Sequence, residues 1–424
     1  MLEKITQIFR VKELRIKILF VLAVFAITRI IANIPVLGIE KGSLRNFFAE
    51  NQAFGLFNLF TGGSMDRLSV VMLGLGPYIT ATIILQLLTM IFPRLNEMYK
   101  EEGETGREKF NQYSRLATIP LSMLQGYAML ALLQRQNILQ PMSLQLTVIS
   151  LVTITAGTML LMFLGELITE KGIGNGISLL IFAGIVTDIP TNIKYLISTF
   201  DKSMIPSYLL FLAMVLIVTA GVVLVTEGKR NIPVSYAKRV RGNKMYGGAS
   251  TYLPLNVNPA GVIPIIFSLS IMLFPRMIAN FFAGGKGVFA HLMGGIASFL
   301  EQPIVYGVMY FILIVLFTFF YTAVTFDPKT TSENLQKMGG FIPGIRPGKP
   351  TASFISYILN RVQFVGALFL GVIAIMPNII GSLTGITVFR FLVGGTALLI
   401  VVSVILETMR QIKSQLQMRE YESF

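Results

Sequence analysis

The strongest constraint on this chain is a series of ten apolar runs, separated by charged residues or by proline and glycine. A hydrocarbon core about 30 Å thick takes about 20 helical residues per crossing. In lipid, only helices and closed barrels satisfy all their backbone hydrogen bonds. The sequence therefore predicts ten membrane-spanning helices, at about 17–34, 69–92, 116–133, 147–167, 176–197, 207–226, 259–282, 303–325, 360–381 and 387–407.

Composition supports a membrane protein over a soluble one. Of the 424 residues, 54% are apolar and only 13% are charged. Soluble globular chains are about a quarter charged. Ten spans use most of the apolar residues and leave little sequence for a soluble domain, so a water-soluble enzyme is excluded.

The distribution of basic residues predicts the orientation. The formal net charge is +14. Most lysines and arginines fall in the terminal segments 1–17 and 408–424 or in loops that share their side of the membrane. Because basic loops stay on the cytoplasmic side, both termini are predicted to be cytoplasmic. The excess charge also fits anionic lipid headgroups as a partner.

Residue types exclude most enzyme chemistry. The chain has no cysteine and one histidine, His291, which is expected in a short non-cytoplasmic loop. No phosphate-binding loop and no G-x-S-x-G nucleophile motif occurs. We therefore expect no enzyme activity, no metal and no cofactor. Ion-coupled transporters usually keep several ionisable residues at mid-membrane, whereas candidates such as Arg29 and Asp188 are few here. A passive conduit or a scaffold is favoured, with a secondary transporter left open.

Two loops on the basic side are too long to be simple connectors. Residues 227–257 alternate apolar and polar positions on both sides of a glycine-rich, basic centre, which predicts a β-hairpin with a basic tip. Residues 326–359 contain GGFIPGIRPGKP, whose glycines and prolines predict an extended, turn-rich segment that presents Arg346.

Six stretches resemble one known family. They are LGLGPYITATIILQLL from Leu73, GETGREKFNQYSR from Gly103, LGELITEKGIGNGISLLIFAGI from Leu164, RVRGNKMYGGASTYLPLNVNPAGVI from Arg239, GGFIPGIRPGKP from Gly339 and GGTALLIVVSVILETMRQIKSQLQMREYE from Gly394. Together, and in this order, they resemble the SecY family, the large subunit of the protein-translocation channel, in a bacterial form. The resemblance covers essentially the whole chain.

The resemblance implies an all-α polytopic membrane fold with two pseudo-symmetric halves of five helices around an hourglass pore. The halves would be residues 1–200 and 201–424, and a short plug helix would lie at about 54–67. Leu75 stands where the family more often has isoleucine, a change that a ring of aliphatic side chains is expected to tolerate.

Four sets of residues are implied by the match. The pore ring would consist of Leu75, Ile79, Ile177, Ile181, Ile266 and Ile400. The lateral gate would include Thr80, Gln86, Asn258, Ser270 and Phe274. The plug would include Phe57, Asn58, Phe60, Gly62 and Gly63. Partner docking would use Arg239, Arg241, Lys244 and Arg346.

The implied function is a protein-conducting channel in the bacterial inner membrane. It would pass unfolded secretory polypeptides and release apolar helices sideways into lipid. Implied partners are SecE-type and SecG-type small membrane subunits, a SecA-type motor ATPase, the ribosome, signal peptides and nascent chains. A membrane insertase that acts as a scaffold, without a through-pore, stays open beside the secondary transporter.

Overall fold

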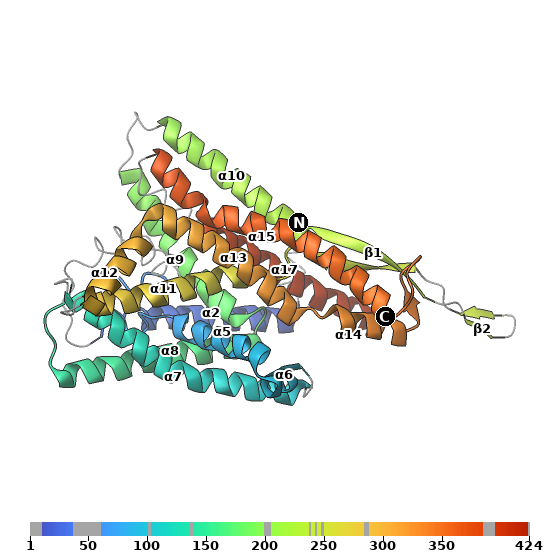
Figure 1. The fold of residues 1–424 in the computed structure, drawn as a ribbon, viewed down its shortest axis with the longest axis horizontal. Coiled ribbons are helices and arrows are strands. Elements are labelled where there is room, and N and C mark those ends of the chain that lie inside the picture. Colours follow the sequence, from blue (N-terminus) through green and yellow to red (C-terminus); the bar gives the residue numbers. More distant parts are fainter. Residues whose placement is uncertain are drawn as a thin grey trace.

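The computed structural model describes residues 11–36, 61–100, 103–135, 139–198, 205–236, 239–241, 244–246, 250–283, 288–384 and 395–422. Each predicted span has a helix there (Figure 1). These helices are α2 (Lys12–Ile31), α5 (Gly76–Ile91), α7 (Gly103–Arg135), α8 (Leu144–Lys171), α9 (Gly176–Ser198), α10 (Ile205–Glu227), α11 (Ile263–Ala283), α13 (Pro303–Thr325), α15 (Lys349–Thr384) and α17 (Gly395–Glu422). The expected helical membrane architecture is confirmed.

The length and composition of each helix indicate whether it could cross a membrane. Within the described residues, five helices are long and apolar enough to cross a membrane. A sixth results if α5 and the following helix α6 (Pro93–Lys100) are counted together, although they are bent by 115° at Phe92. The bend lies where Pro93 follows, and the residue before a proline is disfavoured in helical conformation.

The predicted start of the second span is wrong. The helix begins at Gly76 rather than near residue 69, and residues 61–75 form turns. Leu68 and Gly74 both have positive φ, at 44° and 56°, which a helix does not allow. Pro77 lies in the first turn of α5, where its missing N–H costs nothing. An apolar run alone does not distinguish a helix from buried turns.

Several helical segments lie outside the predicted spans. His291 lies on helix α12 (Val288–Glu301), not in a short loop. Helix α14 (Pro328–Lys337) occupies the first part of the loop expected to be extended, and Asp327 caps it by accepting from the Lys329 N–H at 2.9 Å. Helices α7 and α15 begin more than ten residues before their predicted spans. A search for long apolar runs misses α12 because it is short, and misses the other segments because they are polar.

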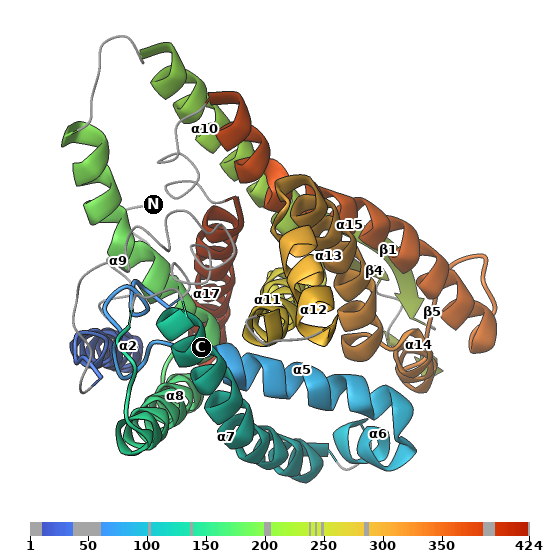
Figure 2. The same cartoon turned by 60° about the vertical axis from the view of Figure 1, so that its left-hand side comes forward.

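The ten long helices fall into two groups of neighbours. Helices α2, α5, α7, α8 and α9 contact one another, and so do α10, α11, α13, α15 and α17. Figure 2 shows α2 and α8 on one side of the view and α13 and α15 on the other, with α17 and α11 between them. The extensive contacts between the groups are those of α11 with α5 and α7, and of α17 with α9.

The predicted hairpin is confirmed. Strands β1 (Lys229–Tyr236) and β4 (Ser250–Asn256) pair antiparallel, and β2 (Arg239–Arg241) pairs with β3 (Lys244–Tyr246) toward the tip. Strand β5 (Gly340–Phe341) adds to the free edge of β1. One apolar cluster joins this sheet to α14 and α15 through Ile232, Val234, Leu255, Leu335, Ile342 and Ile355. The two long loops therefore fold as one unit.

Candidate conducting path and gate

The six residues expected to form a ring belong to one apolar cluster. Ile79 lies on α5, Leu75 caps the same helix, Ile177 and Ile181 lie on α9, Ile266 lies on α11, and Ile400 lies on α17. Leu75, Ile79, Ile181 and Ile400 are buried in the main core, and Ile177 and Ile266 pack against it half-buried. We call these six side chains the aliphatic ring.

The four helices that carry the ring are those that meet between the two helix groups. Helix α5 contacts α11, and α9 contacts α17. The six residues are therefore carried by helices that take part in the contacts between the two groups. Ile400 has no exposed surface, so water does not reach it in this conformation. A constriction of aliphatic side chains excludes ions because it dewets.

The turns from 61 to 75 fit closely against the first helix group because glycines face them. A β-carbon placed on Gly157 of α8 would come within 2.2 Å of the Val70 carbonyl oxygen. A β-carbon on Gly62 would lie 2.8 Å from the Gly184 α-carbon of α9, and Gly62 has a φ of 64°. The backbone approaches both helices more closely than any larger residue permits.

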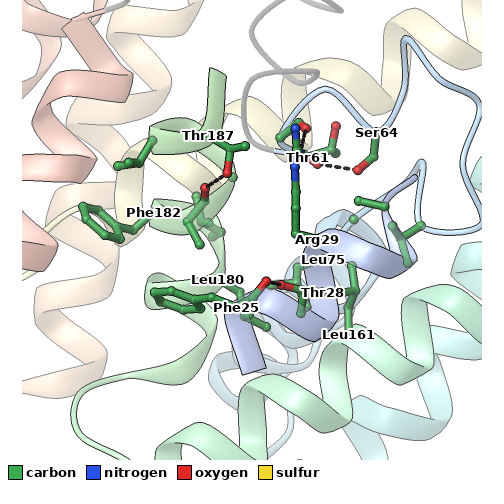
Figure 3. Close-up of a pocket in the computed structure, with 18 of the residues that line it drawn as sticks. Phe25, Thr28, Arg29, Thr61, Ser64, Leu75, Leu161, Leu180, Phe182 and Thr187 are labelled. Atoms are coloured by element: carbon green, nitrogen blue, oxygen red, sulfur yellow. Dashed lines mark hydrogen bonds between the residues drawn. The ribbon is translucent and has the colours of Figure 1, made fainter. Parts of the chain in front are cut away.

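Arg29 ties the start of this segment to α2. Its Nη1 donates to the Gly62 carbonyl at 2.8 Å. Figure 3 shows the side chain extending from α2 toward Thr61, with Thr187 of α9 across from it. These residues line a cavity of about 370 Å³ that also touches the ring residues Leu75 and Ile181. The sequence singled out Arg29 only as a charge within a span, and gave it no role.

The expected plug residues are only partly described. Phe57, Asn58 and Phe60 lie outside the described residues. Gly62 and Gly63 are described, and both have left-handed φ values, of 64° and 71°. Two successive glycines in this conformation form a bend that other residues rarely adopt, at the point where the segment meets the cavity.

The expected gate residues lie on or just before α5 and α11, two helices that contact each other. Thr80 and Gln86 are buried on α5, Ser270 is buried on α11, and Asn258 is buried just before α11. Phe274 lies on α11, and its side chain is outside the described set. We call the contact between α5 and α11 the α5–α11 seam.

The hydrogen bonds of the gate residues are mostly local. Thr80 donates to its own helix at Gly76 O, and Asn258 Nδ2 donates to Gly261 O at 3.0 Å. One bond leaves α5, from Gln125 Nε2 of α7 to Thr80 Oγ1 at 3.5 Å. Gln125 was missed because α7 carries no motif there. None of these bonds joins α5 to α11.

Two buried acceptors at the seam lack partners among the described residues. Gln86 Oε1 and Asn258 Oδ1 accept no hydrogen bond there. A buried acceptor without a partner costs about 1–3 kcal/mol. These two buried groups therefore weaken the packing around α5 and the start of α11.

The docking residues lie at the end of the molecule that carries the sheet. Arg239, Arg241 and Lys244 lie on β2 and β3, with Arg241 opposite Lys244. Arg346 is exposed in a turn anchored from both sides. Thr351 of α15 donates to the Arg346 carbonyl at 2.9 Å, and Ser332 of α14 donates to the Gly348 carbonyl at 2.8 Å. The predicted presentation of Arg346 is confirmed, while its role is not tested by this geometry.

Comparisons with known proteins agree with this architecture. A family model described as SecY matches residues 69–409. The protein translocase subunit SecY of Corynebacterium glutamicum is 43% identical, over 99% of this chain and 98% of the relative.

Two solved structures share the fold. One, titled as the structure of a protein conducting channel, has a TM-score of 0.65 at 20% identity over 93% of this chain and 91% of the other. The other, Sec61 in the canine ribosome-channel complex from the endoplasmic reticulum, has a TM-score of 0.62 at 19% identity with the same coverage.

Proposed function

Because this chain belongs to the SecY family of protein translocase subunits, we propose that its two helix groups form a gated path for unfolded polypeptide. The observation that carries the proposal is the buried aliphatic ring, carried by helices that take part in the contacts between the groups. Such a ring seals against ions when closed and yields to a peptide without binding it. Residues 1–200 and 201–424 are the two moving halves.

Sideways release follows from the nature of the α5–α11 seam. Helices α5 and α11 contact each other, and α5 and the segment just before α11 each carry a buried acceptor without a described partner. When an apolar segment of a nascent chain enters the seam, its surface replaces the apolar surface that the two helices lose. Opening therefore costs little free energy. Opening also lets Gln86 and Asn258 reach water or a passing backbone. The seam therefore releases apolar helices into lipid and stays closed without them.

The turns from 61 to 75 hold the plug below the ring. The Arg29 bond to Gly62 and the close contact with Gly184 fix the base of the plug segment 54–67. Phe57, Asn58 and Phe60 belong to this plug. Gly62 and Gly63 supply the hinge.

The chain itself carries out no covalent chemistry, and its driving force comes from partners. A SecA-type motor or the ribosome docks on the sheet and the Arg346 turn, and SecE-type and SecG-type subunits complete the channel. One structural neighbour is titled as Sec61 in the canine ribosome-channel complex, which supports the ribosome as one of these partners. The chain lies in the inner membrane with both termini cytoplasmic, where basic side chains meet polyanionic partners and anionic lipid.

Docking is tested by Arg346→Glu. We expect motor-driven export to fall severalfold with an unchanged midpoint of thermal unfolding, because the side chain is exposed and the turn is held by backbone bonds. Lys349→Glu, a nearby exposed residue, is the matched control. Equal export by the two variants would remove Arg346 from the docking surface.

The path is tested by a single cysteine. The chain has none of its own, so Ile400→Cys gives one thiol in the ring. A secretory substrate stalled in transit, with one cysteine in the translocating segment, is then oxidised. A disulfide that depends on stalling supports the path. Crosslinks found only at lipid-facing positions such as Ile405→Cys would favour an insertase scaffold, and saturable uptake of a small solute would favour a secondary transporter.

A further inference from the structure

Helix α12 is apolar but too short to cross a membrane. It has 14 residues, which extend over roughly 21 Å against a hydrocarbon core of about 30 Å. It lies between two spanning helices and contacts both α11 and α13. Figure 1 shows it at the end of the molecule opposite the sheet. The helix therefore lies near one membrane surface.

The exposed side chains of α12 that the structure describes form two adjacent edges. Leu292 and Phe299 are 59% and 53% exposed. They are seven residues apart and so project from the same side of the helix. His291 and Ser298 are also exposed and also seven apart. Because each residue advances by about 100°, this polar edge lies beside the apolar edge and not on the opposite side.

The apolar edge leads into a surface that must face lipid. Helix α13 begins two residues after α12 ends, at Pro303. Its Ile304, Val308 and Ile312 are all more than half exposed and follow a four-residue spacing. On a membrane-spanning helix this stripe contacts acyl chains. Exposed apolar side chains on α13 therefore begin within three residues of the end of α12.

We propose that α12 is an interfacial lipid-binding helix. Leu292 and Phe299 insert among the acyl chains of the nearer leaflet, and His291 and Ser298 lie at the headgroups. An amphipathic helix of this kind rests in the interface plane. The segment contains no lysine or arginine, so its binding depends on apolar area and not on anionic headgroups.

This anchoring has a consequence for the gate. Helix α12 contacts α11, and α11 in turn forms the seam with α5. Movement of α12 relative to the bilayer is therefore transmitted to one wall of the seam. The lipid of the leaflet away from the sheet becomes a partner of the gate.

The absence of native cysteines allows a direct test. Leu292→Cys and Phe299→Cys are labelled with a polarity-sensitive fluorophore in phosphatidylcholine vesicles, with Ser298→Cys and His291→Cys as matched controls one residue away. Two quenchers are used: iodide present on both sides, and phosphatidylcholine with a nitroxide near the top of an acyl chain. We expect iodide quenching at 292 and 299 to be about threefold weaker than at 298 and 291, with nitroxide quenching in the opposite order.

Each other outcome overturns the proposal. Equal iodide quenching at all four positions places α12 in water. Protection of 292 and 299 from both quenchers means that protein covers the apolar edge. Because both apolar positions are exposed, their substitution leaves the core intact, and an unchanged midpoint of thermal unfolding for each variant confirms folding.

Discussion

At the scale of single residues, Arg29 is the charge that most needs an explanation. It lies in the last turn of α2, beside a largely apolar cavity, and its guanidinium donates to the Gly62 carbonyl. A hydrogen bond to a charged group is worth about 1.5–3 kcal/mol. The side chain therefore fixes the Gly62 carbonyl at the start of the turns from 61 to 75.

We expect Arg29→Gln to loosen residues 61–64 and to raise ion leak through the closed protein. The measurement is dye or ion flux from vesicles without substrate. Arg67→Gln is the matched control, because Arg67 also bonds to the end of α2, at Asn33 Oδ1, but does not line the cavity. If both variants leak equally, the effect is a general loss of packing and not release of the plug base.

Substitution of Gln86 is expected to stabilise the closed state, whereas substitution of Arg29 is expected to weaken it. Its Oε1 is buried without a partner among the described residues, so Gln86→Leu relieves a cost of about 1–3 kcal/mol. We expect export of substrates with weakly apolar signal peptides to fall, while strongly apolar ones are unaffected. Met90→Leu, at an exposed position of α5, is the control. Equal loss for both substrate classes would point to a folding defect.

At the scale of elements, the turns from 61 to 75 are fixed by glycines of neighbouring helices. Gly157→Ala would place a β-carbon 2.2 Å from the Val70 carbonyl oxygen, so α8 or the turns must shift. Overpacking of this kind typically costs about 1–3 kcal/mol. We expect a lower midpoint of thermal unfolding in detergent.

Gly307→Ala in α13 is the matched control for this prediction. Nothing lies within 4 Å of the added β-carbon there, and alanine is favoured over glycine inside a helix by about 0.5–1 kcal/mol. The two substitutions should therefore change the midpoint in opposite directions. A fall of similar size in both would contradict the close-contact explanation.

Sequence reading succeeded for elements whose signal is an apolar run. Span 303–325 coincides with α13, and span 176–197 nearly coincides with α9. It failed where that signal is ambiguous. Residues 69–75 are apolar but form turns, and the start of α15 is helical but polar. The partners of Gly157 and Arg29 lie far away in sequence, so no local pattern indicates them.

The residues of the aliphatic ring could not be identified from a local sequence pattern either. Its members are ordinary aliphatic residues, and only the resemblance to a family singled them out. Their convergence in one cluster depends on four helices from both halves of the chain. The hairpin, by contrast, was readable from alternation and glycine alone, because both of its strands are local in sequence.

At the scale of the whole molecule, a second contact joins the two helix groups on the side where α17 meets α9. Leu14 of α2 and Ile173 before α9 form a small buried cluster with Ile412 of α17. The Gly174 N–H also donates to Gln411 Oε1 at 2.8 Å. This contact lies apart from the α5–α11 seam, so it is suited to be the fixed side about which the seam opens.

If this cluster is the fixed side, weakening it should affect the assembly of the halves more than the gate. We expect Ile412→Ala, which leaves a cavity between the groups, to cost about 2–5 kcal/mol. The midpoint of thermal unfolding should fall, and export should decline for strong and weak signal peptides alike. Ile405→Ala, at a half-exposed position two turns earlier on the same helix, should change neither. A selective gain for weak signal peptides would instead place Ile412 in the gate, and the α5–α11 seam would no longer be the only side that opens.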